Sequence, residues 1–406
     1  MRPGGRLPLQ GAPPADRQSR IRGVRSAAMR VAPKVMQESQ LQGLATQVLW
    51  IAFALAVVFG GVAQRTHFCT MGAVADIVNM GDWSRMRMWA LAAGVAILGF
   101  NAMVALGWIE AGDSIYATPK FIWLSNALGG VMFGFGMVLA SGCGSKTLVR
   151  LGAGNLKSLL VFFVLGLAAF ATLKGVTAVV RVATVDRVAF ALPAGQDLPS
   201  LLSIATGLAR PTLALVLGAL VGGALLVWAL ARPEGRRGEA LLGGLVTGAV
   251  IAGVWYVSGR LGHVAEHPQT LEETFLATNS QRMESLSFVS PIAYTIDWLL
   301  FFSDTSKVLT LGIVTTIGVI VGSALVALAT RTFRWEGFGG VEDTANHFVG
   351  ALLMGVGGVS ALGCTIGQGL SGLSTLSIGS IIALVGILLG AVLALRYQVW
   401  RLDRMA

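Results

Sequence analysis

Nine apolar stretches, each long enough to cross a lipid bilayer, dominate the 406-residue chain. A transmembrane helix needs about 20 mostly apolar residues. The stretches cover residues 45–64, 87–109, 121–141, 157–180, 211–231, 239–257, 308–329, 346–363 and 376–396. Hydrophobic residues make up 54% of the chain and charged residues 12%, which is typical of a membrane protein. The sequence therefore predicts an all-α polytopic membrane protein with about nine transmembrane helices.

Four shorter segments interrupt these stretches. They cover residues 68–80, 143–153, 287–303 and 364–374, and they begin with FCTMG, CGSKT, SFVSP and CTIGQG. Each is too short or too rich in glycine to cross the bilayer as a regular helix. Irregular backbone at membrane depth is tolerated where it is buried in protein or lines a polar path. We therefore expect four short broken or re-entrant helices.

The order of these segments indicates an internal repeat. The pattern of span, short segment, two spans, short segment and span occurs twice, separated by the lone span 211–231. Because the lone span carries the chain across once more, the second unit enters from the opposite face and forms an inverted repeat. The predicted organisation is a basic disordered tail (1–43), a first repeat (44–182), a linker with the lone span (183–236), a second repeat (237–398) and a carboxyl-terminal tail (399–406). Met29 or Met36 is an alternative start of the chain.

A single offset of 221 positions relates the two repeats. It superposes Cys143 on Cys364, and it also superposes four pairs of glycines. These pairs are Gly129 with Gly350, Gly134 with Gly355, Gly136 with Gly357, and Gly142 with Gly363. Asp76 and Asp297 also occupy related places, as a proton or ion relay or as structural caps. A thiol at equivalent positions of two half-structures predicts a site on the internal symmetry axis.

Two glycine-flanked cysteines carry the most specific chemistry. Cys143 lies between Gly142 and Gly144, and Cys364 follows Gly363. We expect the chain to turn at glycine and each cysteine to open a short helix. The free N–H groups and the dipole at a helix N-terminus favour an anion. Two such N-termini on one axis would form an anion site lined by thiols, whereas the alternative is a small buried residue that only packs.

Three further candidate residues accompany these two cysteines. Cys69 begins the first short segment, and its counterpart in the second repeat is Val289 or Ser290. Lys146 and Gln368 follow Cys143 and Cys364 by one turn, as a holder of negative charge and a polar lining residue. The three cysteines show no CxxC spacing, so we expect no disulfide framework, no bound metal and no cofactor. A path of weak sites releases its ion more readily than one strong site, which favours neutral thiols over thiolates.

Taken together, the motifs RTHFCTMGAVAD, SGCGSKTLVRLG, SFVSPIAYT and LGCTIGQGLSGLS resemble those of the YeeE/YedE family of membrane proteins, over residues 45–396. The resemblance implies nine spans with short broken helices in two inverted halves, forming an hourglass-shaped protein for thiosulfate uptake. It also implies that S–H hydrogen bonds of Cys69, Cys143 and Cys364 pass thiosulfate along. A cytosolic sulfur-carrier (TusA-like) or rhodanese-like protein is the implied partner.

Charge patterning predicts the orientation. With the amino terminus outside, the inner connections carry 14 Lys and Arg residues and the outer connections carry 7. Cytoplasmic connections carry an excess of Lys and Arg, so we expect a multi-pass inner-membrane protein with a periplasmic amino terminus and a cytoplasmic carboxyl terminus. The net charge of +10 then faces anionic lipid. Nucleic acid is excluded as a partner because no basic stripe carries stacking aromatic residues.

The preferred hypothesis is a permease, not an enzyme, that takes up a small sulfur-containing anion, most simply thiosulfate. The first alternative is transport of a selenium compound or another sulfur oxyanion through the same path. The second is a membrane sulfurtransferase or thiol oxidoreductase with a persulfide on Cys143 or Cys364. A purely structural membrane subunit is a further alternative, which the glycine-punctuated short segments disfavour.

Overall fold

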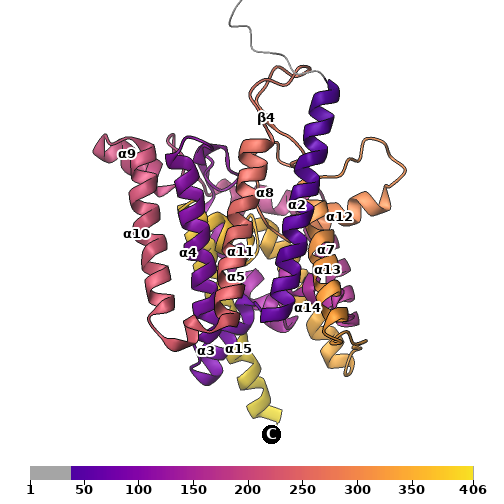
Figure 1. The fold of residues 1–406 in the computed structure, drawn as a ribbon. Helices are drawn as coiled ribbons and strands as arrows, with labels where there is room; N and C mark the ends of the chain where they lie inside the picture. Colours follow the sequence, from indigo (N-terminus) through magenta and orange to yellow (C-terminus); the bar gives the residue numbers. More distant parts are fainter. Residues whose placement is uncertain (1–37, 406) are drawn as a thin grey trace, which may run out of the picture.

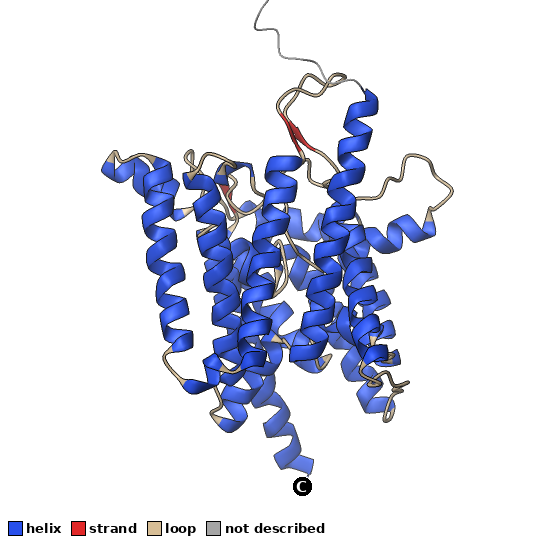
Figure 2. Ribbon diagram, in the orientation of Figure 1, coloured by secondary structure: helices blue, strands red, loops and turns tan. Residues whose placement is uncertain are grey.

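Helices form most of residues 38–405, which are the residues that the computed structural model describes (Figures 1 and 2). Nine helices of this described range have 17 residues or more. They are α2 (Glu38–Thr66), α4 (Ser84–Ala105), α5 (Trp123–Leu139), α7 (Leu156–Lys174), α10 (Arg210–Leu230), α11 (Gly238–Tyr256), α13 (Leu311–Ala329), α14 (Val341–Ser360) and α15 (Ile378–Met405). The start of α2 and the end of α15 lie at opposite ends of the bundle (Figure 1).

Eight stretches within residues 38–405 are long and apolar enough to cross a membrane. The long helix outside these eight is α14, whose first turn carries Glu342 and Asp343. The prediction of an all-α polytopic membrane protein is therefore confirmed. Each of the nine predicted spans corresponds to one long helix, although the apolar stretch of α14 is the weakest of the nine.

Short helical elements occur where the four broken segments are predicted. Three of them are the α-helices α3 (Thr70–Met80), α6 (Gly144–Gly152) and α12 (Ser290–Leu300). The fourth is a π-helical turn, η5 (Gly367–Gly372), instead of an α-helix. None of these elements has more than 11 residues, so none is long enough to cross a bilayer alone.

The structure corrects three predicted boundaries. The predicted span 157–180 is wrong at its end, because Gly175 adopts an extended conformation (φ −105°, ψ −154°) and separates α7 from α8 (Val176–Ala183). The predicted disordered tail 1–43 is wrong for residues 38–43, which already belong to α2, and the rest of the tail lies outside the described residues. The predicted carboxyl-terminal tail continues α15 as far as Met405.

The connections contain small elements that the apolar pattern does not predict. They are the helix α9 (Leu198–Thr206), the short helices η1 (Ala111–Asp113), η2 (Val185–Arg187), η3 (Pro233–Arg236) and η4 (Val257–Leu261), and four two-residue strands. Strand β1 (Lys120–Phe121) pairs antiparallel with β2 (Phe190–Ala191), and β3 (His263–Val264) pairs antiparallel with β4 (Thr274–Phe275).

Helix packing has a pseudo-two-fold symmetry: each contact between the long helices of the two repeats has a counterpart in which every helix is replaced by the equivalent helix of the other repeat. Helix α2 packs against α13, and its counterpart α11 packs against α4. In the same way α5 packs against α15, and α14 packs against α7. The exchange also relates the contact of α12 with α7 to that of α3 with α15. Helices α5 and α14 pack against each other, so the pseudo-two-fold axis passes between them.

Glycines allow α5 and α14 to approach closely at this axis. A methyl group on Gly357 would lie 2.6 Å from the carbonyl oxygen of Gly129. A methyl group on Gly136 would likewise lie 2.6 Å from the carbonyl oxygen of Gly350. The offset of 221 positions exchanges these two contacts. The repeated glycines are therefore needed at the contact between the halves, where any side chain would meet backbone atoms.

Two ion pairs are related by the same pseudo-two-fold symmetry. Asp76 on α3 pairs with Arg85 at 3.1 Å, and Asp297 on α12 pairs with Lys307 at 2.5 Å. Arg85 lies in the first turn of α4, and Lys307 lies in the connection that leads into α13, so each pair ties a short helix to the segment that follows it. These contacts favour the structural interpretation of the two aspartates over an ion relay.

Candidate functional site

Two equivalent backbone breaks precede the glycine-flanked cysteines. Ser141 and Leu362 adopt left-handed conformations, with φ of 56° and 59°. The prediction that the chain turns at glycine is therefore wrong by one residue. In each break the next amide closes the end of the long helix, because Gly142 N–H donates to the Met137 carbonyl and Gly363 N–H to the Gly358 carbonyl, both at 2.8 Å.

The glycines after these turns give the chain room to fold back onto its short helix. A methyl group on Gly142 would lie 3.2 Å from Cγ of Lys146, and one on Gly363 would lie 3.1 Å from the backbone nitrogen of Gln368. Both distances are tighter than ordinary van der Waals contact. Gly144 is less constrained, since its nearest neighbour would be the Phe288 carbonyl oxygen at 3.4 Å.

Cys143 opens its short helix, as predicted, whereas Cys364 lies three positions before the first residue of η5. Cys143 is the N-cap residue of α6, and its Sγ lies 3.2 Å from the hydroxyl of Ser145. Cys364 precedes η5, and its Sγ accepts a hydrogen bond from the Gly367 amide at 3.4 Å. Both thiols are free and almost completely buried, with exposures of 1% and 0%.

Cys69 occupies the same kind of position on the third short helix. It is the N-cap residue of α3, and its Sγ accepts a hydrogen bond from the Gly72 amide at 3.3 Å. The N-cap residue of the equivalent helix α12 is Val289, which is fully buried and has no polar side chain. The third thiol therefore has no partner under the pseudo-two-fold exchange.

The fold brings all three thiols into one neighbourhood. Cys143 interacts electrostatically with both Cys69 and Cys364. Phe288, which stacks on Phe59, packs in the same buried cluster as Cys143 and Cys364. The backbone of Phe288 lies between the two breaks, with its carbonyl oxygen facing Gly144 and its amide facing Cys364. Cys143 is thus the central thiol of the three.

A cavity of about 420 Å³ contains Ser141, in the break before Cys143, and Lys146, which interacts electrostatically with Cys69, although none of the three cysteines lines it. We call it the basic cavity, and its lining residues include Lys146, Arg150, Lys157, Arg334, His67 and Ser141. Lys157 is neutralised by Asp343 at 2.9 Å, and Arg150 donates to the Ser141 carbonyl at 2.7 Å. Lys146 makes no ion pair among the described residues, and it interacts electrostatically with Cys69. Arg150 and Arg334 also make no ion pair among the described residues, but Lys146 is the one that directly follows the break before Cys143, so we take it as the first cation that an anion near the thiols would meet.

A second cavity, of about 270 Å³, opens at the other break. We call it the serine cavity, and its polar lining residues are Ser280, Ser285, Ser287, Ser290, Glu284, Tyr294, Asn279 and Arg181. It contains Leu362, whereas the basic cavity contains the equivalent residue Ser141. The start of α13 lines the serine cavity and the turn after its end lines the basic cavity, so the two open at opposite ends of the bundle. The thiols lie between them.

Gln368 is predicted to line an open polar path, but in the structure it is enclosed by protein. Its side chain is 1% exposed and belongs to neither cavity. The side-chain amide donates to the Ala361 carbonyl in the break, while Oε1 has no hydrogen-bond partner in the described part of the chain. Gln368 therefore braces the break before Cys364.

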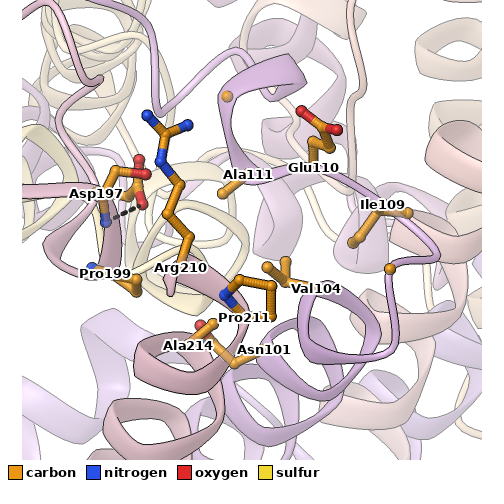
Figure 3. A pocket seen from close by; sticks show the side chains of 13 residues that line it. Asn101, Val104, Ile109, Glu110, Ala111, Asp197, Pro199, Arg210, Pro211 and Ala214 are labelled. Carbon is orange, nitrogen blue, oxygen red and sulfur yellow. Dashed lines mark hydrogen bonds between the residues drawn. The ribbon is translucent and has the colours of Figure 1, made fainter. Parts of the chain in front are cut away.

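A third cavity, of about 280 Å³, lies away from the thiols between α4, α9 and α10 (Figure 3). The Arg210 side chain lies near Asp197, and Glu110 lines the opposite side (Figure 3). Asp197 caps α9 through a 2.9 Å hydrogen bond from the Ser200 amide. Burial raises the pKa of this carboxyl, and its hydrogen bonds with Ser200 oppose the rise. These contacts assign Asp197 a structural role.

The serine cavity is the part of the site that the sequence does not reveal. Ser287, Ser290 and Tyr294 lie in the motif SFVSPIAYT, but the other lining residues come from α7, α8, the start of α13, the end of α14 with the break after it, and the connections before α5 and α12, so that no single motif contains the cavity. One signal is available: Ser287 precedes the N-cap residue Val289 by two positions, as His67 precedes Cys69. His67 lines the basic cavity and Ser287 lines the serine cavity.

Comparison with known proteins identifies the family. The family model described as sulphur transport matches residues 65–393, which include all three cysteines. The thiosulfate transporter TsuA of Escherichia coli is 27% identical over 339 residues, or 82% of this chain and 89% of that protein. The thiosulfate transporter TsuA of Spirochaeta thermophila is 25% identical over 359 residues, or 84% and 97%. The probable transporter YedE of Escherichia coli is 30% identical over 109 residues, about a quarter of each chain. The YeeE/YedE family, which the sequence motifs resemble, is this sulphur transport family. This multi-pass membrane protein therefore belongs to the sulphur transport family.

Proposed function

We propose that this protein carries thiosulfate across the inner membrane. The observation that carries the proposal is the row of three free, buried thiols between two cavities that open at opposite ends of the bundle. Membership of the sulphur transport family and the similarity to proteins named thiosulfate transporters support the choice of substrate. A permease needs a continuous path for its substrate, and it does not need to make or break a covalent bond of that substrate.

The thiols act as successive hydrogen-bond donors to the passing anion. Backbone amides donate to the sulfurs of Cys69 and Cys364, so these sulfurs serve as acceptors toward the protein. Their S–H hydrogens remain available to a sulfur or oxygen atom of thiosulfate. A thiolate would repel the anion, whereas neutral thiols bind it weakly and let it leave. Cys143 passes the anion between the two other thiols.

The helix termini supply the remaining stabilisation. Cys143 caps α6, and Cys69 caps α3, so free backbone N–H groups point toward the thiols. The positive end of the helix dipole favours an anion at the same place. The helix termini therefore compensate part of the lost hydration of the anion with partial charges, and the full positive charge of Lys146 lies where the path reaches the basic cavity.

The excess of Lys and Arg on one side orients the path. We assign the basic cavity to the cytoplasmic face, with the carboxyl terminus, and the serine cavity to the periplasmic face. Thiosulfate then enters at the serine cavity and leaves at Lys146. A cytosolic sulfur-carrier (TusA-like) or rhodanese-like protein would receive it at the basic cavity.

Uptake of labelled thiosulfate tests the proposal. Cells that lack other thiosulfate transporters are expected to accumulate the label when they express this chain, and not with an empty vector. Competition by excess sulfite, sulfate and selenite then ranks the substrates. Stronger competition by selenite than by unlabelled thiosulfate would indicate that the preferred substrate is a selenium oxyanion. If the cells accumulated none of these anions, the proposal would be refuted.

Replacement of the unpaired lysine is expected to slow release at the basic cavity. Lys146→Gln removes a charge-assisted interaction, which is typically worth about 1.5–3 kcal/mol. Because about 1.4 kcal/mol corresponds to a factor of ten, we expect uptake to fall by at least about tenfold. Lys146→Arg keeps the charge and should retain most of the uptake.

Arg232→Gln is the matched control for this prediction. It removes a positive charge from the exposed connection between α10 and α11, away from the thiols. Uptake by this variant should equal that of the wild type when both are normalised to protein in the membrane. An equal loss in both variants would indicate a general effect of surface charge and would contradict a specific role for Lys146.

A further inference from the structure

A carboxylic acid lies in the cavity through which an anion would have to enter. Glu284 lines the serine cavity together with Ser287 and Ser290. Ser287 connects this cavity to the thiols, because a methyl group on Gly367 would lie 2.6 Å from its Oγ, and Gly367 N–H donates to Cys364. An ionised carboxylate in a cavity of about 270 Å³ would repel a dianion.

No cation of the described chain neutralises Glu284 by an ion pair. Arg181 of α8 also lines the cavity, but it pairs with Asp186 at 3.5 Å. The adjacent Arg282 turns away and donates to the carbonyl of Gly112. A carboxylate without a partner cation is costly in a partly buried site, and protonation removes that cost.

The other titratable groups that face Glu284 do not favour its charged form. They are the hydroxyls of Tyr116, in the connection before α5, and Tyr294, on α12, and both interact electrostatically with this carboxylate. Burial raises the pKa of the Glu284 carboxyl, while hydrogen bonds from Ser280 and the backbone of Asn279 act in the opposite direction. The protonated form is therefore accessible nearer to neutral pH than for an exposed glutamate.

We propose that Glu284 is a proton-binding group of the transport path and that the anion enters the serine cavity only when this carboxyl is protonated. The proposal rests on the proposed function. Protonation removes the repulsion, and the carboxyl gains an O–H donor beside the hydroxyls of Ser287 and Ser290. The protonated cavity then presents a set of donors suited to an oxyanion.

The alternative is that Glu284 only braces its own loop. Its Oε1 accepts hydrogen bonds from the Ser280 amide at 2.9 Å and from the Ser280 hydroxyl. A glutamine at this position keeps an oxygen acceptor for both bonds but cannot ionise. Glu284→Gln therefore separates the two roles, because a brace alone does not make uptake depend on pH.

The test is the external pH dependence of labelled thiosulfate uptake by the full chain in proteoliposomes of fixed internal pH. Thiosulfate itself does not titrate near neutral pH. Wild-type uptake should fall by about tenfold per pH unit above the pKa of Glu284, since the protonated fraction falls at that rate. Uptake by Glu284→Gln should not fall with pH. Glu272→Gln, at an exposed glutamate of the same connection, should keep the wild-type profile.

For a second variant, Ser280→Ala, the direction of the shift in the pH dependence of uptake can be predicted. Ser280→Ala removes a hydroxyl that stabilises the ionised carboxylate, so the pKa of Glu284 rises further. The pH of half-maximal uptake should therefore move upward. A flat wild-type profile, or a fall with pH that persists in Glu284→Gln, would overturn the inference while leaving thiosulfate transport intact. Absence of wild-type uptake at every pH would overturn both proposals.

Discussion

Replacement of Cys143 by alanine is expected to abolish thiosulfate uptake while the folded protein remains in the membrane. Cys143 is the central thiol, and it interacts with both Cys69 and Cys364. Its loss would interrupt the path at the point where the two breaks meet. The substitution removes one sulfur atom from a buried position, so we expect only a small loss of stability, typically about 1 kcal/mol. Uptake and thermal melting of the purified protein measure the two effects separately.

Two further variants distinguish a common path from independent sites. Cys364→Ala should also abolish uptake, and the double variant should be no worse than either single one, because both thiols serve one path. Cys143→Ser keeps a short O–H donor and should retain part of the activity. Normal uptake by Cys143→Ala with normal protein levels would eliminate the relay. A stable sulfur adduct on Cys143 in mass spectrometry would instead favour the sulfurtransferase alternative.

The positions of the helices and of the two cysteine breaks could be predicted because their signals are local. A transmembrane span is recognised by the length of its apolar stretch, and the short segments are recognised by their glycines and by a length too small to cross the bilayer. The 221-residue offset adds a relation that glycine abundance alone does not produce. It pairs Cys143 with Cys364, and the structure gives the two the same turn geometry.

The left-handed turns show where such local reasoning fails. Glycine is the usual residue at positive φ, so the glycine after each turn is the natural expectation. Ser141 and Leu362 take that conformation instead. The adjacent Gly142 and Gly363 are required by close packing onto the short helix, which depends on contacts that only the folded chain contains.

The cavities could not be predicted, because their walls come from distant parts of the chain. The basic cavity combines Lys146 of α6 with Arg334 of the turn after α13. The serine cavity joins Glu284 to Leu362, which lie in different connections. Each residue taken alone is an ordinary polar or apolar residue near a helix end. Only the helix packing shows which of them share a cavity with the thiol path.

Replacement of Gly357 by valine is expected to prevent stable packing of the two halves. The first carbon of the new side chain would lie 2.6 Å from the Gly129 carbonyl oxygen and 2.6 Å from the Phe133 backbone nitrogen. Both atoms belong to the backbone of α5, so the helices must separate to relieve the contact. Overpacking a core typically costs about 1–3 kcal/mol and occasionally more. We expect a lower melting temperature or a loss of monodisperse protein in detergent.

Gly223→Val is the matched control, because it makes the same substitution in a long helix where a methyl group would meet no atom within 4 Å. Valine is also a better helix residue than glycine, so this variant should melt at or above the wild-type temperature. Gly136→Val places its side chain against the Gly350 carbonyl across the same axis and should reproduce the loss. Wild-type melting in Gly357→Val and Gly136→Val would show that α5 and α14 do not meet as closely as the pseudo-two-fold contact requires. The symmetric position of the two thiols depends on that contact, so it would then lose its structural basis.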